Sequence, residues 1–155
     1  MLFPIRKKVF CVWLAALALL FPARSLSREI TDEIGRTVHL RPEARRIVSL
    51  APGITETLYL LGLEDRIVGV TTFCDWPAAA AQKEKVGGFV NPSVEKIVSL
   101  NPDLVLATAD GNRRETVRQL EKLRLSVYVI NPTDIRGILE SIVHIGELTG
   151  KKQQA

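Results

Sequence analysis

The stretch GGFVNPSVEKIVSLNPDLVLAT, residues 87–108, decides the fold because it contains a loop, a helix and a buried strand in succession. The Asn-Pro pair at 91–92 favours an extended backbone, and Ser93 stands at the N-cap position before an apolar helical pattern. The Asn-Pro pair at 101–102 ends this helix, since the residue before a proline is disfavoured in the α region. Residues 104–107 are apolar without alternation, which is typical of a strand covered on both faces of a parallel sheet.

Glu95 falls in the first turn of this predicted helix. The unpaired amides and the dipole of a helix N-terminus favour a carboxylate there by about 0.3 to 1 kcal/mol. From the residues alone, a role in starting the helix therefore explains Glu95 as well as a functional role does.

The rest of the chain repeats the alternation of strand and helix. The predicted strands are 47–51, 66–71 and 126–130, and the predicted helices are 54–61, 78–85 and 112–123, the last one capped by Asn112. Before them, residues 30–40 fit two short strands around a turn at Gly35. The fold class is therefore α/β, with a Rossmann-like parallel sheet of about four strands flanked by helices.

One strand is followed by a tight turn, Pro52-Gly53, and then by a helix. Ligands of open α/β sheets bind at such strand ends, where helix amides point outwards. Residues 51–56 contain neither the GxGxxG fingerprint nor the lysine of a P-loop. This absence disfavours a dinucleotide- or nucleotide-dependent enzyme.

Residues 1–27 have the pattern of an export signal: a positive start, an apolar run at 9–21 and small residues near Ser25 and Ser27. They hold four of the 21 basic residues and no acidic one, so the remainder carries 17 charges of each sign. The exported part is neutral, which disfavours nucleic-acid binding. It retains Cys74 as its one cysteine, which leaves no internal disulfide and no multi-cysteine metal site.

The last segment shows a helical apolar stripe from Ile135 to Ile145 that continues to Gly150. An Asn-Pro-Thr sequence at 131–133 precedes it and is expected to start the helix. No further strand follows, so this helix either closes the domain or leads into a second one.

Four segments together resemble the N-terminal lobe of the periplasmic substrate-binding proteins of cobalamin and ferric-siderophore ABC importers. They are RRIVSLAPGITE at 45–56, RIVGVTTFCDWP at 66–77, the stretch 86–107 and LSVYVIN at 125–131. The resemblance implies an N-terminal lobe at 28–132 and, at 133–155, the start of the long helix that joins two lobes. The second lobe has no counterpart in this sequence.

The resemblance also implies roles for single residues. Glu95 matches the glutamate that docks on an arginine pocket of the transmembrane permease. Phe73, Trp76 and Phe89 fall on loops that open onto the ligand cleft, and flat aromatic faces suit a corrin ring or a siderophore catecholate. Ordinary packing is the alternative for these aromatic residues, most of all for Trp76. By the same resemblance, Pro52 and Gly53 line the same edge of the sheet.

Several expectations follow for the whole protein. It is a periplasmic protein, monomeric when complete, that binds a metal chelate and an importer permease, with no cofactor, no metal site and no catalysis of its own. The Cys-Asp-Trp-Pro and Gly-Gly-Phe loops favour cobalamin as ligand. A ferric-siderophore or heme binding protein of the same type is the alternative.

Two hypotheses of other classes stay open at this point. A small secreted α/β enzyme could use Asp75, Asp110 and His144 as acid-base groups, although these do not form a recognisable set. An exported module could also bind a partner protein without any small ligand.

Overall fold

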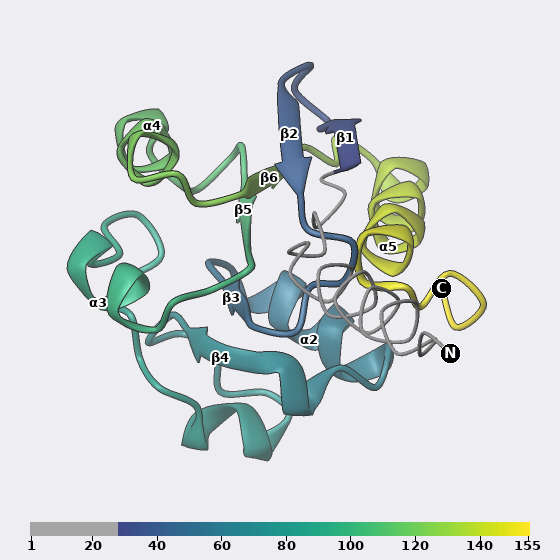
Figure 1. Ribbon diagram of the computed structural model, residues 1–155. Helices are drawn as coiled ribbons and strands as arrows, with labels where there is room; N and C mark the ends of the chain where they lie inside the picture. The colour runs from purple at the N-terminus through teal and green to yellow at the C-terminus, as the bar shows by residue number, and fades with distance from the viewer. Residues whose placement is uncertain (1–27) are drawn as a thin grey trace, which may run out of the picture.

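The structure is a computed structural model that describes residues 28–155, so the predicted export segment at 1–27 lies outside the described residues. Its centre is a four-stranded parallel sheet with the strand order β4-β3-β5-β6 (Figure 1). The strands are β3 (Ile47–Ser49), β4 (Ile67–Val70), β5 (Leu104–Thr108) and β6 (Val127–Ile130). This arrangement confirms the predicted fold class.

Helices cover both faces of the sheet. Successive residues of β5 belong to different cores: Leu104 and Leu106 pack on one side, Val105 and Ala107 on the other. The first core includes side chains of α2 (Pro52–Leu60) and α5 (Ile135–Thr149), and the second includes those of α3 (Val94–Ser99) and α4 (Arg114–Lys122). Two buried faces explain why the strand sequences are apolar without alternation.

A separate antiparallel hairpin, β1 (Arg28–Thr31) and β2 (Thr37–Leu40), precedes the sheet, as the sequence predicted. Gly35 lies in its turn with a φ of +82°, a conformation that glycine adopts without steric cost. On β2, Val38 and Leu40 are buried in the core that α2 and α5 share. The hairpin is therefore part of the lobe and not a loose extension.

The turn of the hairpin is held by Asp32, whose side chain is fully buried. Its carboxylate accepts hydrogen bonds from the backbone amides of Arg36 at 2.8 Å and of Val129 at 3.3 Å, and it pairs with the Arg36 guanidinium at 2.6 Å. Arg36 in turn donates to Glu121 on α4 at 2.8 Å. Asp32 thus joins the hairpin to β6 and, through Arg36, to α4.

The neighbouring Glu33 makes the equivalent connection to α5. Its carboxylate accepts hydrogen bonds from the backbone amide of Asn131 at 2.7 Å and from the Ser141 hydroxyl at 2.8 Å, and it lies 3.0 Å from Nδ1 of His144. Burial, and after it the negative charge of Glu33, raises the pKa of Tyr128 on β6 well above its ordinary value. Tyr128 therefore stays neutral between the hairpin and the sheet.

Three predicted helix boundaries are wrong. Pro52 and Gly53 are not a turn before a helix but the first two residues of α2, because a proline fits the first helical position, where its missing N–H would have no partner. Residues 78–85 form only a short 3₁₀ helix, Ala78–Gln82. Asn112 does not cap α4, since Arg113 occupies that position and makes no side-chain cap.

The last helix is shorter than the predicted segment 133–155. It begins at Ile135, where the Asp134 side chain accepts a hydrogen bond from the Gly137 amide at 2.7 Å. It ends at Gly150, which has a φ of +74°, and residues 151–155 contain turns in place of further helix. The predicted helix that starts after Thr133 and continues to Gly150 is therefore confirmed.

The apolar stripe of α5 is divided between core and solvent. Ile145 and Leu148 are buried against the sheet, whereas Ile135 is 79% exposed and Ile138 and Leu139 are exposed as well. Only the second half of the stripe is used for packing within residues 28–155. None of the helices in this part of the chain is long and apolar enough to cross a bilayer.

The Asp32 contacts predict a large effect on stability. Replacement Asp32→Ala leaves the amides of Arg36 and Val129 without their side-chain acceptor and removes one of the acceptors of the Arg36 guanidinium. We therefore expect the free energy of unfolding to fall by about 2 to 4 kcal/mol. Denaturant titration measures this loss. Glu29→Ala is the control, because Glu29 makes only an exposed contact with His39, and a loss below about 1 kcal/mol in Asp32→Ala would contradict the role of Asp32.

Candidate ligand-binding and docking site

The candidate site lies where the connections of the sheet diverge. From β3 the chain proceeds to β4 on one side, whereas from β5 it proceeds to β6 on the other side. Ligands of open α/β sheets bind outside the carboxyl ends of strands at such a switch point. The segments that follow β3, β4 and β5 therefore form the edge to be considered.

Asn112 links three of these segments, and it is only 6% exposed. Its side-chain oxygen accepts a hydrogen bond from the amide of Thr108 at 2.8 Å. Its side-chain nitrogen donates to the carbonyls of Leu50 at 3.1 Å and of Phe89 at 2.7 Å. This role of Asn112 was not predicted, although the turn-forming run Asp-Gly-Asn at 110–112, just after a buried strand, is a signal for a structured loop.

Phe89 packs directly on the backbone of Gly111. A Cβ atom at position 111 would lie 1.7 Å from the Phe89 Cζ atom, so any side chain there would have to displace the ring. The amide of Asn112 holds the backbone of Phe89 at the same place. Glycine at 111 is therefore needed for the position of the ring.

A shallow apolar groove of about 570 Å³ opens at this edge. Its lining residues are Pro52, Phe73, Gly88, Phe89, Val90 and Asn91. Phe73 is 62% exposed and Phe89 is half-buried, so both rings present surface to the groove. The structure thus brings together three of the five residues predicted for the ligand site.

The other two predicted residues do not line the groove. Gly53 is exposed in the first turn of α2, and Trp76 is 68% exposed in the loop after β4. Its exposure argues against the packing alternative for Trp76. For Gly53 and Trp76, contact with the ligand stays a prediction.

Buried hydroxyl groups support the loop that carries Phe73. The Thr55 hydroxyl donates to Ser49 Oγ at 2.8 Å and contacts Cys74 Sγ at 3.2 Å. On the other side of the thiol, Thr71 Oγ1 lies 3.1 Å from Sγ. These contacts fix Cys74, the residue next to Phe73, at the ends of β3 and β4.

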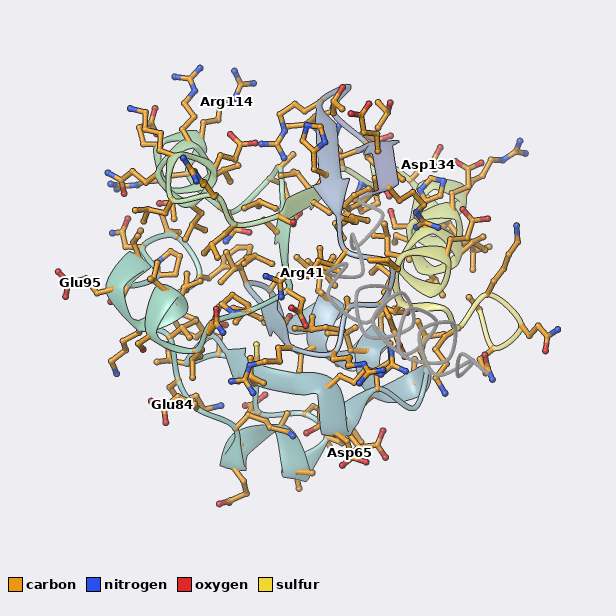
Figure 2. All side chains as sticks on the ribbon, in the orientation of Figure 1. Arg41, Asp65, Glu84, Glu95, Arg114 and Asp134 are labelled. Carbon is orange, nitrogen blue, oxygen red and sulfur yellow. The ribbon has the colours of Figure 1, made fainter. Side chains whose placement is uncertain are left out.

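Glu95 lies on the first turn of α3 with an exposed side chain. Figure 2 shows its carboxylate pointing away from the body of the protein. The helix start does not depend on it, because Ser93 is the N-cap and accepts a hydrogen bond from the Lys96 amide at 3.2 Å. Glu95 is therefore free to meet a partner.

The three acid-base candidates of the enzyme hypothesis are not linked to one another by hydrogen bonds or ion pairs within residues 28–155. Asp75 is exposed, Asp110 accepts a hydrogen bond from the Thr108 hydroxyl, and His144 contacts Glu33. In the same part of the chain, no three His, Cys, Asp or Glu side chains are grouped so that they could hold a metal ion.

Comparison with known proteins identifies the family. The model of the family "Periplasmic binding protein" matches residues 47–155, which is most of the chain. The chain belongs to the periplasmic binding protein family.

Individual members of this family show a consistent partial match. The chain is 38% identical over 129 residues to the ABC transporter substrate-binding lipoprotein YvrC of Bacillus subtilis, covering 81% of this chain and 41% of YvrC. It is 34% identical over 112 residues to the vitamin B12-binding protein of Yersinia pestis, covering 72% of this chain and 40% of that relative. The chain thus spans about two fifths of the length of these relatives.

The same is seen among solved structures. A periplasmic heme binding protein from Pseudomonas aeruginosa superposes with a TM-score of 0.67 at 28% identity, over 72% of this chain and 40% of that protein. The family assignment and the parallel sheet therefore agree with the resemblance inferred from sequence.

The contact of Phe89 with Gly111 predicts opposite effects for two glycine replacements. In Gly111→Ala the new methyl group must displace the Phe89 ring, so we expect a loss of about 1 to 3 kcal/mol in unfolding free energy. Gly53→Ala is the control, because no atom lies within 4 Å of its Cβ position, and it should be neutral or stabilising by up to about 1 kcal/mol.

Denaturant titration of both variants checks this expectation. In the double variant Gly111→Ala/Phe89→Ala the clash is absent, so the two losses should be clearly less than additive. Additive losses would show that residues 89 and 111 are not in contact.

Proposed function

We propose that this chain forms the N-terminal lobe of an extracytoplasmic substrate-binding protein that delivers a metal chelate, cobalamin in particular, to the permease of an ABC importer. The observation that carries the proposal is the groove with two aromatic rings, Phe73 and Phe89, at the switch point of the sheet. The names of the relatives support it, since they include an ABC transporter substrate-binding lipoprotein and a vitamin B12-binding protein. The export pattern at 1–27 agrees with a periplasmic location.

The shape of the groove fits one half of a binding site. Small-molecule sites commonly cover about 70 to 90% of the ligand surface, whereas this groove is open on one side. Its apolar walls and exposed rings suit a large planar ligand that a second surface covers from the opposite side. In the proposed function, that second surface is the other lobe.

A ferric-siderophore or heme ligand is the second candidate, and the heme-binding structure from Pseudomonas aeruginosa supports it. Protein ligands of heme iron are His, Cys, Met or Tyr side chains. The six residues that line the groove include none of these types. The lining of this groove therefore offers no axial ligand to heme iron, which favours cobalamin over heme.

Docking on the permease is assigned to Glu95. Its carboxylate is exposed and makes no ion pair with any other residue of 28–155. An unpaired charge that projects from a rigid helix can steer association and fix the register of a complex. An arginine pocket on the permease is the complementary surface.

Ligand titration tests the ligand assignment. Because one lobe supplies about half of the contacts, we expect cyanocobalamin to bind this chain with a dissociation constant near 0.1 mM. Phe73→Ala should weaken binding further, about tenfold, since it removes an exposed ring from the groove. Calorimetry or chemical-shift mapping measures both, with heme and a ferric catecholate as competing probes, and tighter binding of heme would contradict the cobalamin assignment.

Charge reversal tests the docking role. Glu95→Arg should leave the free energy of unfolding within about 1 kcal/mol of the original, because Ser93 caps the helix. Binding to a purified cobalamin importer should weaken more than about tenfold, since two like charges would then face each other. Glu64→Arg is the matched control: it reverses an exposed first-turn glutamate in the short helix before β4. Equal losses of binding in the two variants would refute the docking role of Glu95.

A further inference from the structure

Helix α4 and the residues beside it carry a basic surface that the ligand site does not use. We call it the α4 basic face; it consists of Arg113, Arg114, Arg118, Lys122 and Arg124, all exposed. None of these five side chains makes a hydrogen bond or ion pair within residues 28–155, whereas Glu121 on the same helix is paired with Arg36. The face is thus strongly positive on a lobe whose charges balance overall.

Two of these cations, Arg113 and Arg114, stand where they cost helix stability. Arg113 occupies the N-cap without a side-chain cap, and Arg114 begins the helix, although the dipole disfavours cations at this end. Arg114, Arg118 and Lys122 follow one another at spacings of four residues, so like charges repel along the helix. Glu115 is the acidic residue of the first turn, but in the described part of the chain no ion pair joins it to Arg113 or Arg114. Cations that break local rules in this way indicate a functional surface.

The packing of α4 directs this face outwards. Thr116, Val117 and Leu120 are buried on its inner side. Figure 2 shows Arg114 pointing away from the body of the protein. A groove of about 330 Å³ beside the hairpin includes Arg114 and Arg118 in its lining, but both are exposed, so it does not enclose a single anion. The geometry fits an extended anionic surface better than one bound ion.

We propose that the α4 basic face binds the anionic phospholipid headgroups of a membrane surface. The proposal rests on the proposed function, in which the protein works beside a membrane permease. Helix α3, which carries Glu95, is the neighbour of α4 on the same side of the sheet (Figure 1). Leu123, between Lys122 and Arg124, is 53% exposed and adds an apolar side chain to the same face.

Vesicle partitioning tests this proposal without any permease or chelate. The exported protein is sedimented with vesicles of phosphatidylcholine alone and with vesicles that also contain about 30% phosphatidylglycerol, an anionic lipid. The readout is the ratio of the two partition coefficients. At about 50 mM salt we expect a ratio above roughly twenty, which falls severalfold at about 300 mM because the charges are screened. A ratio below about three at low salt would overturn the proposal.

A pair of triple variants locates the binding surface. Neutralising Arg114, Arg118 and Lys122 to Gln should lower the ratio about tenfold or more, since each cation near an anionic surface contributes up to about fivefold. The matched control changes the net charge equally with Arg136, Lys151 and Lys152 to Gln, which lie on or after α5 on the opposite side of the sheet. Equal losses in the two triple variants would show binding by net charge alone and refute the assignment to α4.

One single variant separates this role from a structural one. Arg113→Asp supplies the missing N-cap, so the melting temperature should rise by a few degrees while the vesicle ratio falls. If the vesicle ratio is unchanged in all α4 variants but their binding to the importer weakens, the face contacts protein and the lipid proposal fails. Failure here leaves the chelate and Glu95 assignments untouched, because neither is probed by vesicles.

Discussion

The candidate site depends on the side-chain amide of Asn112. A buried amide must satisfy both its oxygen and its nitrogen, and here the partners are backbone groups of Leu50, Phe89 and Thr108. Leu50 follows β3, Phe89 lies in the loop before α3, and Thr108 is the last residue of β5. A single residue therefore fixes three connections of the switch point. The position of the Phe89 ring, and with it one wall of the groove, follows from this crosslink and from the absence of a side chain at Gly111.

Much of the architecture could be predicted from local patterns. Apolar runs such as 104–107 indicate strands buried on both faces, and Ser93 is the helix cap that the sequence indicated. The cap prediction for Asn112 is wrong because an Asn before a helical pattern is a common N-cap, whereas two of its three partners lie 23 and 62 positions away. Long-range hydrogen bonds leave no local pattern. For the same reason, spacing in the sequence could not predict which of the five candidate residues line the groove. Pro52, Phe73 and Phe89 do, whereas Gly53 and Trp76 do not.

The two sides of the sheet differ in what they leave at the surface. On the side of α5, half of an apolar stripe is exposed, as at Ile135 and Leu139. On the side of α3 and α4, most exposed side chains of the two helices are charged, with the acid Glu95 next to a basic helix. An apolar surface is stabilised when a partner buries it, whereas a charged surface steers association and makes contacts that weaken with salt. The two kinds of surface therefore suit different partners. The lobe therefore offers separate surfaces to separate partners.

The hairpin turn gives this arrangement a mechanical property. Asp32 attaches the turn to β6 and Arg36 attaches it to α4. Glu33, which follows Asp32, attaches the same turn to α5. Helices on opposite faces of the sheet thus share one short clamp, so neither can slide without breaking charged hydrogen bonds to the same five-residue turn. The lobe should consequently move as one rigid body. A displacement of α4 should be transmitted to α5 through the hairpin turn, without a change in the sheet between them.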